Sequence, residues 1–110
     1  NTFSLGGEWT INDEESVAGE NATLTYTFIA NKVHLVLRPG EAKQPAKVRV
    51  FLDDKLVDTT NKGIDVKSGI VTIDTDRLYT LIDLQGKTTS HTLKLEFLTP
   101  GVQAFAFTFG

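Results

Sequence analysis

Two histidines and three groups of neighbouring carboxylates are the side chains that could carry acid–base chemistry. His34 and His91 lie far apart in the sequence, and no serine lies in a Gly-x-Ser-x-Gly elbow. His91 shares the parity of Leu93 and Leu95, which predicts an inward side chain bonded to a backbone group. His34 has the opposite parity and is expected at the surface. We predict that this segment is not an enzyme and needs no cofactor.

The carboxylate groups all lie in or beside predicted turns, where aspartate caps backbone groups. Asp74 and Asp76 are a candidate calcium site, because calcium takes several oxygens from one loop. The loop lacks the spaced ligand series of a calcium-binding motif, so no metal is expected there. The three groups are Asp13 with Glu14 and Glu15, Asp53 with Asp54, and Asp74 with Asp76.

A possible binding face is indicated by side chains opposite the main apolar stripe of several strands. Phe51 and Tyr79 would stack on a ligand there, and two arginines would donate hydrogen bonds. We predict a groove that binds a glycan or a peptide segment. An alternative is that a loop, the chain termini or a neighbouring domain covers this face. The candidate residues are His34, Arg49, Phe51, Arg77 and Tyr79.

Alternation of apolar and polar residues runs through the whole chain and predicts β-strands. "TLTYTFIA" and "VHLVLR" are separated only by "NK", which indicates a hairpin, and "DDK" indicates a second turn. No segment has a helical period. About eight strands and a longer link, "RPGEAKQPAK", favour an antiparallel two-sheet sandwich of the jelly-roll type, with the link joining the sheets.

The last strand, "VQAFAFTF", carries three phenylalanines at alternate positions. Phe105, Phe107 and Phe109 stand opposite small residues such as Ala104 and Ala106, so the rings must supply the buried side of this strand. Burial of each ring contributes about 1.5 to 3 kcal/mol. We therefore predict that all three belong to the core. Trp9, which shares its parity with Ile11, is also expected in the core.

Composition limits the partners of the chain. The 110 residues fit one domain, with 40% hydrophobic and 23% charged residues and a formal charge of −3. Basic residues are scattered and no apolar run reaches membrane-spanning length, so neither nucleic acid nor direct membrane insertion is expected. The absence of cysteine excludes thiol chemistry within the segment. Because the sequence begins with asparagine, we expect a single domain, residues 1–110, excised from a larger protein.

Several segments, taken in order, resemble the C-terminal domain of DipZ-like thioredoxin-family proteins, which are linked to cytochrome c biogenesis and disulfide exchange. The resemblance extends from Gly6 to Gly110. One difference is Asp54, which stands where the family pattern has a glycine after aspartate. The segments are "GGEWTI", "LTYTFIANKVHLVL", "VRVFLD", "GIDV", "RLYTLIDL" and "HTLKLEFLTPGVQAFAFTFG".

The resemblance implies a jelly roll similar to carbohydrate-binding modules, on the extracytoplasmic side of the membrane and attached to a thioredoxin-fold domain that holds the redox cysteines. From it we expect a non-catalytic accessory domain that binds a glycan or a peptide segment. The alternative is a structural docking domain that packs on the thioredoxin domain and orients it without a free ligand.

Overall fold

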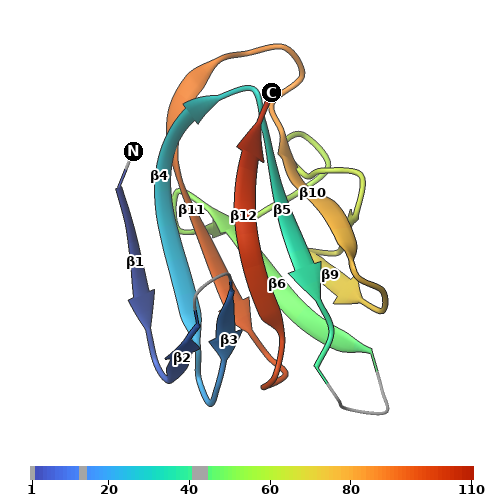
Figure 1. Ribbon diagram of the computed structural model, residues 1–110. Coiled ribbons are helices and arrows are strands. Elements are labelled where there is room, and N and C mark those ends of the chain that lie inside the picture. The colour runs from blue at the N-terminus through green and yellow to red at the C-terminus, as the bar shows by residue number, and fades with distance from the viewer. Residues whose placement is uncertain (1, 13–14, 41–44) are drawn as a thin grey trace.

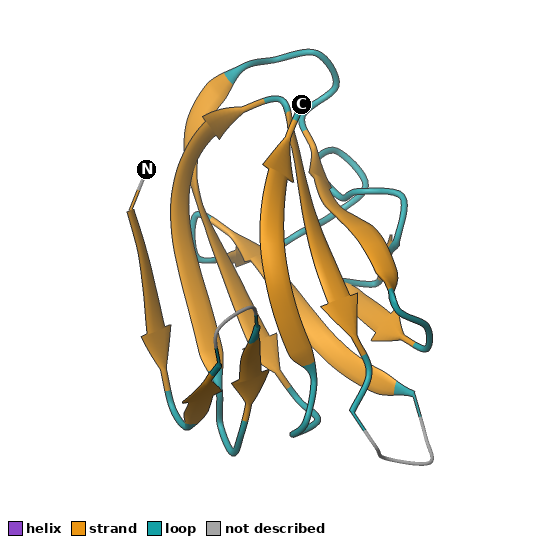
Figure 2. Cartoon of the chain, viewed as in Figure 1, coloured by secondary structure: helices purple, strands orange, loops and turns teal. Residues whose placement is uncertain are grey.

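The chain folds into two antiparallel β-sheets packed face to face (Figures 1 and 2). The computed structural model describes residues 2–12, 15–40 and 45–110. These residues form twelve strands and no helix, and so no helix that could cross a membrane. The predicted all-β sandwich is confirmed.

Sheet A contains seven strands and sheet B five. In sheet A the order is β1 (Thr2–Gly6), β4 (Thr23–Ala30), β11 (Thr89–Phe97), β6 (Ala46–Leu52), β9 (Ile70–Ile73) and β8 (Val66–Lys67), with β7 (Lys55–Leu56) also paired to β6. In sheet B the order is β10 (Arg77–Asp83), β5 (Lys32–Arg38), β12 (Gln103–Phe109), β3 (Ser16–Ala18) and β2 (Trp9–Ile11).

The core lies between the sheets and is built from alternate residues of the long strands. Phe28, Leu35 and Leu95 are among its fully buried side chains. Trp9 packs against this core as predicted, with its ring edge-on to Phe97 and its indole N–H donating to the Gly6 carbonyl at 2.8 Å. Apart from the hydroxyl of Tyr79, no polar or charged side-chain group among the described residues belongs to a fully buried residue.

The predicted hairpin at "NK" is wrong, because β4 belongs to sheet A and β5 to sheet B. Asn31 directs its backbone groups to other segments. Its N–H donates to the Gly110 carbonyl at 3.0 Å, and its carbonyl accepts from Leu84 N at 2.8 Å. The chain therefore changes sheet at this residue instead of turning back on β4.

Two other predicted connections are confirmed. The "DDK" turn joins β6 to β7 as a hairpin, in which Asp53 and Asp54 both have positive φ, 51° and 66°. The link that follows β5 leads from sheet B to sheet A, as expected. Residues 41–44 of that link are outside the described part of the chain, as are Asp13 and Glu14 of the first carboxylate group.

A β-bulge in β12 changes the prediction for the terminal phenylalanines. The register with β5 shifts between Ala104 and Phe107. Phe107 and Phe109 pack against the core beside Tyr26, with ring centres 4.7 and 5.5 Å from it. Phe105 instead lies under the Arg38 guanidinium, whose carbon is 5.0 Å from the ring centre. The prediction is thus right for two rings and wrong for Phe105.

Candidate functional site

The five residues of the predicted groove do not lie together. Arg49 and Phe51 are on β6 in sheet A, whereas His34 is on β5 and both Arg77 and Tyr79 are on β10 in sheet B. The structure therefore divides the predicted site between the two layers of the sandwich.

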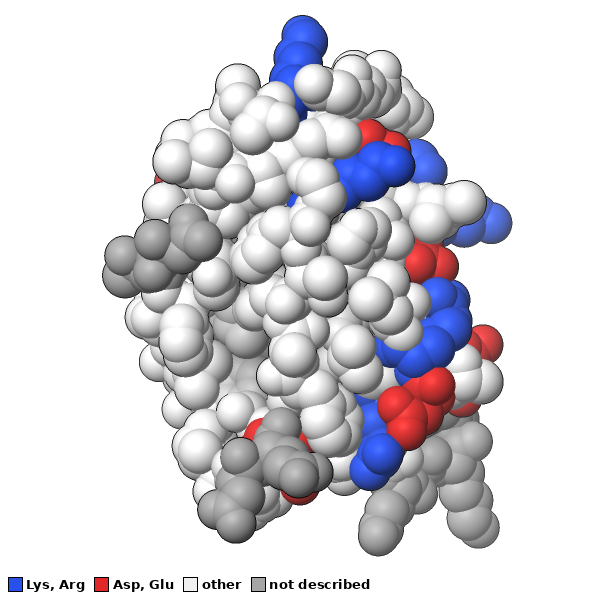
Figure 3. All heavy atoms as spheres, turned by 45° about the horizontal axis from the view of Figure 1, so that its top comes forward, with Lys and Arg blue, Asp and Glu red and all other residues white. Residues whose placement is uncertain are grey.

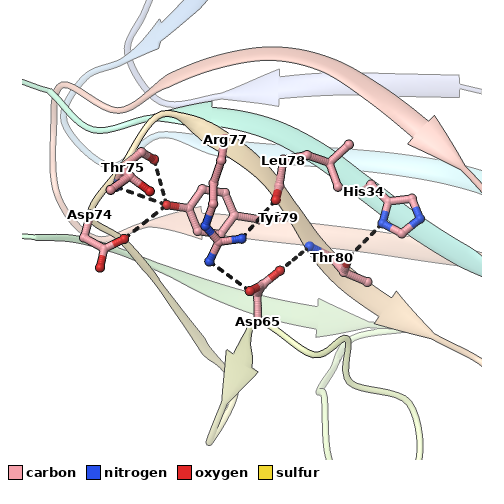
Figure 4. A network of polar contacts seen from close by, with 8 residues as sticks. All are labelled: His34, Asp65, Asp74, Thr75, Arg77, Leu78, Tyr79 and Thr80. Carbon is pink, nitrogen blue, oxygen red and sulfur yellow. Dashed lines mark hydrogen bonds and ion pairs between the residues drawn. The ribbon is translucent and has the colours of Figure 1, made fainter.

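Tyr79 is a core residue, and the expectation of an exposed stacking ring is wrong. The side chain is fully buried. Its hydroxyl donates to the Thr75 carbonyl at 2.8 Å and accepts from Thr75 N at 3.3 Å (Figure 4). On β10 it is Leu78 that faces out, and the register with β5 shifts between Thr80 and Ile82. Because of this shift, the adjacent residues Leu81 and Ile82 are both buried. The apolar pattern of the sequence therefore does not show which alternate residues of the strand face the core.

Arg77 covers the Tyr79 ring instead of facing a ligand. Its guanidinium carbon lies 3.9 Å from the ring centre, and it pairs with Asp65 at 2.9 Å. Asp65 also accepts from Thr80 N at 2.7 Å. Burial alone would raise the pKa of the Asp65 carboxyl, but the hydrogen bonds from Arg77 and Thr80 and the Arg77 charge outweigh it and lower that pKa. The contacts in Figure 4 attach the segment before β8 to β10.

The other predicted residues also have partners within the fold. His34 Nδ1 contacts Thr80 Oγ1 at 2.9 Å, which ties β5 to β10. Arg49 pairs with Glu96 at 3.0 Å on the outer face of sheet A. The Lys94 ammonium lies 5.9 Å from the centre of the half-buried Phe51 ring.

Asp74 and Asp76 point to different partners, which does not favour the candidate calcium site. Asp76 pairs with Arg38 at 2.9 Å, whereas Asp74 accepts a long hydrogen bond of 3.5 Å from the Tyr79 hydroxyl. Within the described ranges, no group of three His, Asp or Glu side chains could hold a metal ion.

A pocket of 450 Å³, the end pocket, lies where the β6–β7 turn meets the segment before β8 and the start of β11. Leucine side chains form the apolar part of its lining, and charged and polar side chains form the rest. Such a mixed lining suits a ligand that has both polar groups and apolar faces. Sequence reasoning missed it, because its residues come from turns that are distant in the chain. It is lined by Leu52, Asp53, Lys55, Leu56, Asp58, Thr60, Asn61, Leu84, Lys87, Thr89 and His91.

A chain of three polar side chains occupies one wall of the end pocket. His91 Nε2 contacts Thr89 Oγ1 at 2.8 Å, and its Nδ1 contacts the Asp53 carboxylate at 2.5 Å. Asp53 also accepts from Thr92 N at 2.9 Å. Burial would raise the Asp53 pKa, but the hydrogen bonds from His91 and Thr92 and the His91 charge lower it. The prediction that His91 bonds a backbone group is wrong, since its partners are side chains.

Another part of the end-pocket lining is a tight turn with its own internal bonds. Asp58 Oδ1 accepts from Thr60 N at 2.8 Å, and Asn61 Oδ1 accepts from Asp58 N at 2.9 Å. Lys55 and Lys87 make no side-chain hydrogen bond or ion pair within the described part of the chain. The end pocket therefore combines carboxylate and amide acceptors that are held by hydrogen bonds with two lysine ammonium groups that have no hydrogen bond or ion pair in the described residues.

A second pocket of 380 Å³ is formed mainly by the turn before β4 and the segment after β11. Only Glu20 and Glu96 bring charge to it, and the other lining residues are Asn21, Ala22, Thr23, Phe97, Leu98 and Pro100. The end pocket offers more side-chain donors and acceptors, so it is the better candidate site.

Comparison with known protein families gives one match that covers the whole chain. The family described as "Thioredoxin like C-terminal domain" matches residues 1–110. The chain therefore belongs to the thioredoxin-like C-terminal domains. The comparison with curated proteins gave no significant match.

Two solved structures share the fold. One is an active-site mutant of a family two carbohydrate esterase from Clostridium thermocellum, in complex with "celluohexase". The other is a family two carbohydrate esterase from Clostridium thermocellum in complex with cellohexaose. Each is 15% identical to this chain with a TM-score of 0.70, and the match covers 99% of this chain and 31% of the esterase. At this identity the likeness shows the fold alone, and this chain spans about a third of the esterases' length.

Proposed function

We propose that the chain is a non-catalytic accessory binding domain of an extracytoplasmic thioredoxin-like protein and that its end pocket binds a glycan. The observation that carries this proposal is the convergence of polar side chains on a pocket of 450 Å³. We propose that the parent protein belongs to the DipZ-like proteins of cytochrome c biogenesis and disulfide exchange. The partner of this domain would then be the thioredoxin-fold domain of that parent protein.

The chemistry of the end pocket suits a sugar. Sugar hydroxyls both donate and accept hydrogen bonds, and the pocket offers the carboxylates of Asp53 and Asp58 beside the ammonium groups of Lys55 and Lys87. The C–H faces of a sugar ring need apolar surface, which Leu84 and its leucine neighbours supply. The related fold in an esterase structure with cellohexaose makes cellohexaose a reasonable first probe.

The test is to titrate the 110-residue chain with cellohexaose and with a panel of other oligosaccharides, including cell-wall fragments. Isothermal titration calorimetry measures the binding. Lys55→Met and Lys87→Met should weaken binding without loss of stability, because neither ammonium has a partner in the described fold. Lys67→Met, at an exposed position on β8 away from the pocket, is the matched control and should bind normally. Absence of binding to every glycan would refute the proposal.

A second candidate is a docking domain for the thioredoxin fold. An apolar row crosses the outer face of sheet B, where Leu78 is 42% exposed beside its cross-strand partner Val36 and the half-buried Phe105 lies on the next strand. A sheet face that meets only water is expected to be more polar. A flat partner domain could cover this row.

Docking is tested in a two-domain protein. Leu78→Lys should lower the thermal midpoint of the joined domains and leave that of the isolated domain unchanged, because the side chain is already exposed when the domain is alone. Independent tumbling of the two domains in NMR relaxation measurements would exclude docking. Neither result bears on glycan binding, so the two candidates are tested separately.

A further inference from the structure

The backbone of β12 has hydrogen-bonding groups directed away from sheet B. At the end of the strand, Gly110 N donates to the Lys32 carbonyl at 3.0 Å and Lys32 N to the Gly110 carbonyl at 3.2 Å. Bonded pairs recur at every second residue of an antiparallel ladder, so the next bonded pair is Thr108 with His34. The N–H and carbonyl groups of Phe107 and Phe109 therefore point away from β5.

This outer edge of β12 is open along half of the strand. β3 pairs only with Gln103 and Ala104. Beyond Ala104, the only backbone partners that the described residues supply to β12 and Gly110 are β5 and Asn31, which directly precedes β5. Proteins commonly guard such edges with lysine, proline or a bulge. Here the bulge protects the strand only as far as Phe107, and residues 103–109 include neither charge nor proline.

Sheet B also stops short of covering sheet A beside this edge. β1 is the last strand of sheet A, and Phe3 on it is 59% exposed although it faces inward beside Tyr26. The Phe3 and Tyr26 rings lie 6.1 Å apart, and Tyr26 also contacts Phe107 and Phe109. One more strand next to β12 would lie over Phe3 and complete the aromatic cluster.

We propose that a second copy of this chain supplies that strand, with β12 pairing to β12 across a two-fold axis at Thr108. Antiparallel pairing centred on Thr108 sets Phe107 of each copy opposite Phe109 of the other, so the free backbone groups satisfy one another. The inward rings of each copy then lie over Phe3 of its partner. Residues 2–6 and 103–109 carry no charge in a chain of formal charge −3, so the copies meet without repulsion at this edge.

The surface view agrees with this arrangement. Figure 3 shows a broad uncharged area, and most of the lysines, arginines and carboxylates seen in this view lie along its right-hand side. An isologous contact requires such a self-compatible surface, whereas a charged edge would repel its own copy. The pairing does not depend on the glycan proposed for the end pocket.

Cross-linking tests the axis directly, because the chain has no natural cysteine. Residues in a non-bonded antiparallel pair have Cα atoms about 4.5 Å apart, within the range of a disulfide. Thr108→Cys should therefore form a covalent dimer under mild oxidation, as judged by non-reducing electrophoresis and intact mass. Thr72→Cys, exposed on β9 of the other sheet, is the control and should remain monomeric. Equal cross-linking of the two variants, or none with Thr108→Cys, would overturn the proposal.

A second pair of variants separates the contribution of the backbone hydrogen bonds from that of the Phe109 ring. Phe109→Ala and Phe109→Pro both remove the ring, but only proline removes the N–H that points to the open edge. In sedimentation velocity from micromolar to millimolar concentration, the wild-type chain should self-associate. The dimer of Phe109→Pro should dissociate about tenfold more readily than that of Phe109→Ala, since two symmetric hydrogen bonds are lost. A wild-type chain that stays monomeric, or variants that behave alike, would contradict the pairing.

Discussion

The guanidinium carbon of Arg77 lies 3.9 Å from the centre of the Tyr79 ring, and Asp65 holds the guanidinium there through a 2.9 Å ion pair. The arginine thus covers an aromatic ring that is otherwise enclosed by the core. A pair that sequence parity assigned to ligand binding instead stabilises the link between β10 and the segment before β8 (Figure 4).

The first prediction concerns the acid stability that Asp65 provides. The pKa of the Asp65 carboxyl is lower in the folded chain than the usual aspartate value of about 3.9. The carboxylate therefore stabilises the fold above that value, and the stabilisation is lost as pH falls through the folded pKa. Asp65→Asn should unfold more easily at neutral pH, with a difference from wild type that shrinks towards pH 2. Urea titrations across this range measure the effect.

The partner of Asp65 supplies the control. Arg77→Met removes the charge but keeps an apolar stem over Tyr79, so its cost at neutral pH should be smaller than the cost of Asp65→Asn. A double-mutant cycle of the two changes should give a coupling energy of about 0.5 to 1 kcal/mol, as for partly exposed ion pairs. Additive effects would show that the ion pair does not stabilise the fold.

The second prediction separates packing from binding at Tyr79. Tyr79→Ala should lower the free energy of unfolding by about 3 to 5 kcal/mol, because it empties a fully buried site. Tyr79→Phe keeps the ring and loses only the hydroxyl's bonds to Thr75 and the long one to Asp74, for a cost of about 1 kcal/mol. Chemical denaturation measures both. A stable Tyr79→Ala chain with altered ligand affinity would return Tyr79 to the binding site.

The third prediction compares neighbouring phenylalanines on β12. Phe105→Ala should cost less than about 1 kcal/mol, because the half-buried ring lies outside the core and its loss removes mainly the contact with Arg38. Phe107→Ala removes a ring packed on Tyr26 and the core and should cost about 1 to 3 kcal/mol. Thermal denaturation of the two variants, which have the same composition, gives the comparison. Equal costs would mean that the bulge does not divide the strand into two faces.

The two-sheet architecture is readable from the sequence, because alternation and turn residues act locally. The hairpin at Asp53 and Asp54 was predictable for the same reason. The bulges were not: a bulge inverts the parity of every later residue, and its position depends on the partner strand. Both failed parity predictions, for Phe105 on β12 and for Tyr79 on β10, lie at register shifts.

The end pocket shows a different limit of the sequence. His91 was expected to bond a backbone group, but its partner Asp53 lies on a hairpin distant in the chain, and β11 pairs with β6 only after the fold forms. The change of sheet at Asn31 was hidden similarly, since the "NK" pair is as short as a hairpin turn. Side-chain types were visible in each case, whereas their neighbours depended on long-range pairing.

The last prediction concerns the two aspartates of the β6–β7 turn. A two-residue turn with positive φ at both positions favours Asp-Gly, because glycine adopts this conformation without strain. Asp54 has φ 66° and is exposed, so Asp54→Gly should raise the free energy of unfolding by up to about 1 kcal/mol.

Asp53→Gly is the matched control for this prediction, because it makes the same chemical change one residue earlier in the same turn. Asp53 also has positive φ, 51°, but its carboxylate accepts hydrogen bonds from His91 and Thr92. Loss of these bonds should outweigh the relief of strain, so Asp53→Gly should destabilise the chain while Asp54→Gly stabilises it. Parallel urea titrations give the sign of each change. Stabilisation by both variants would mean that the contacts of Asp53 with β11 add nothing to the fold.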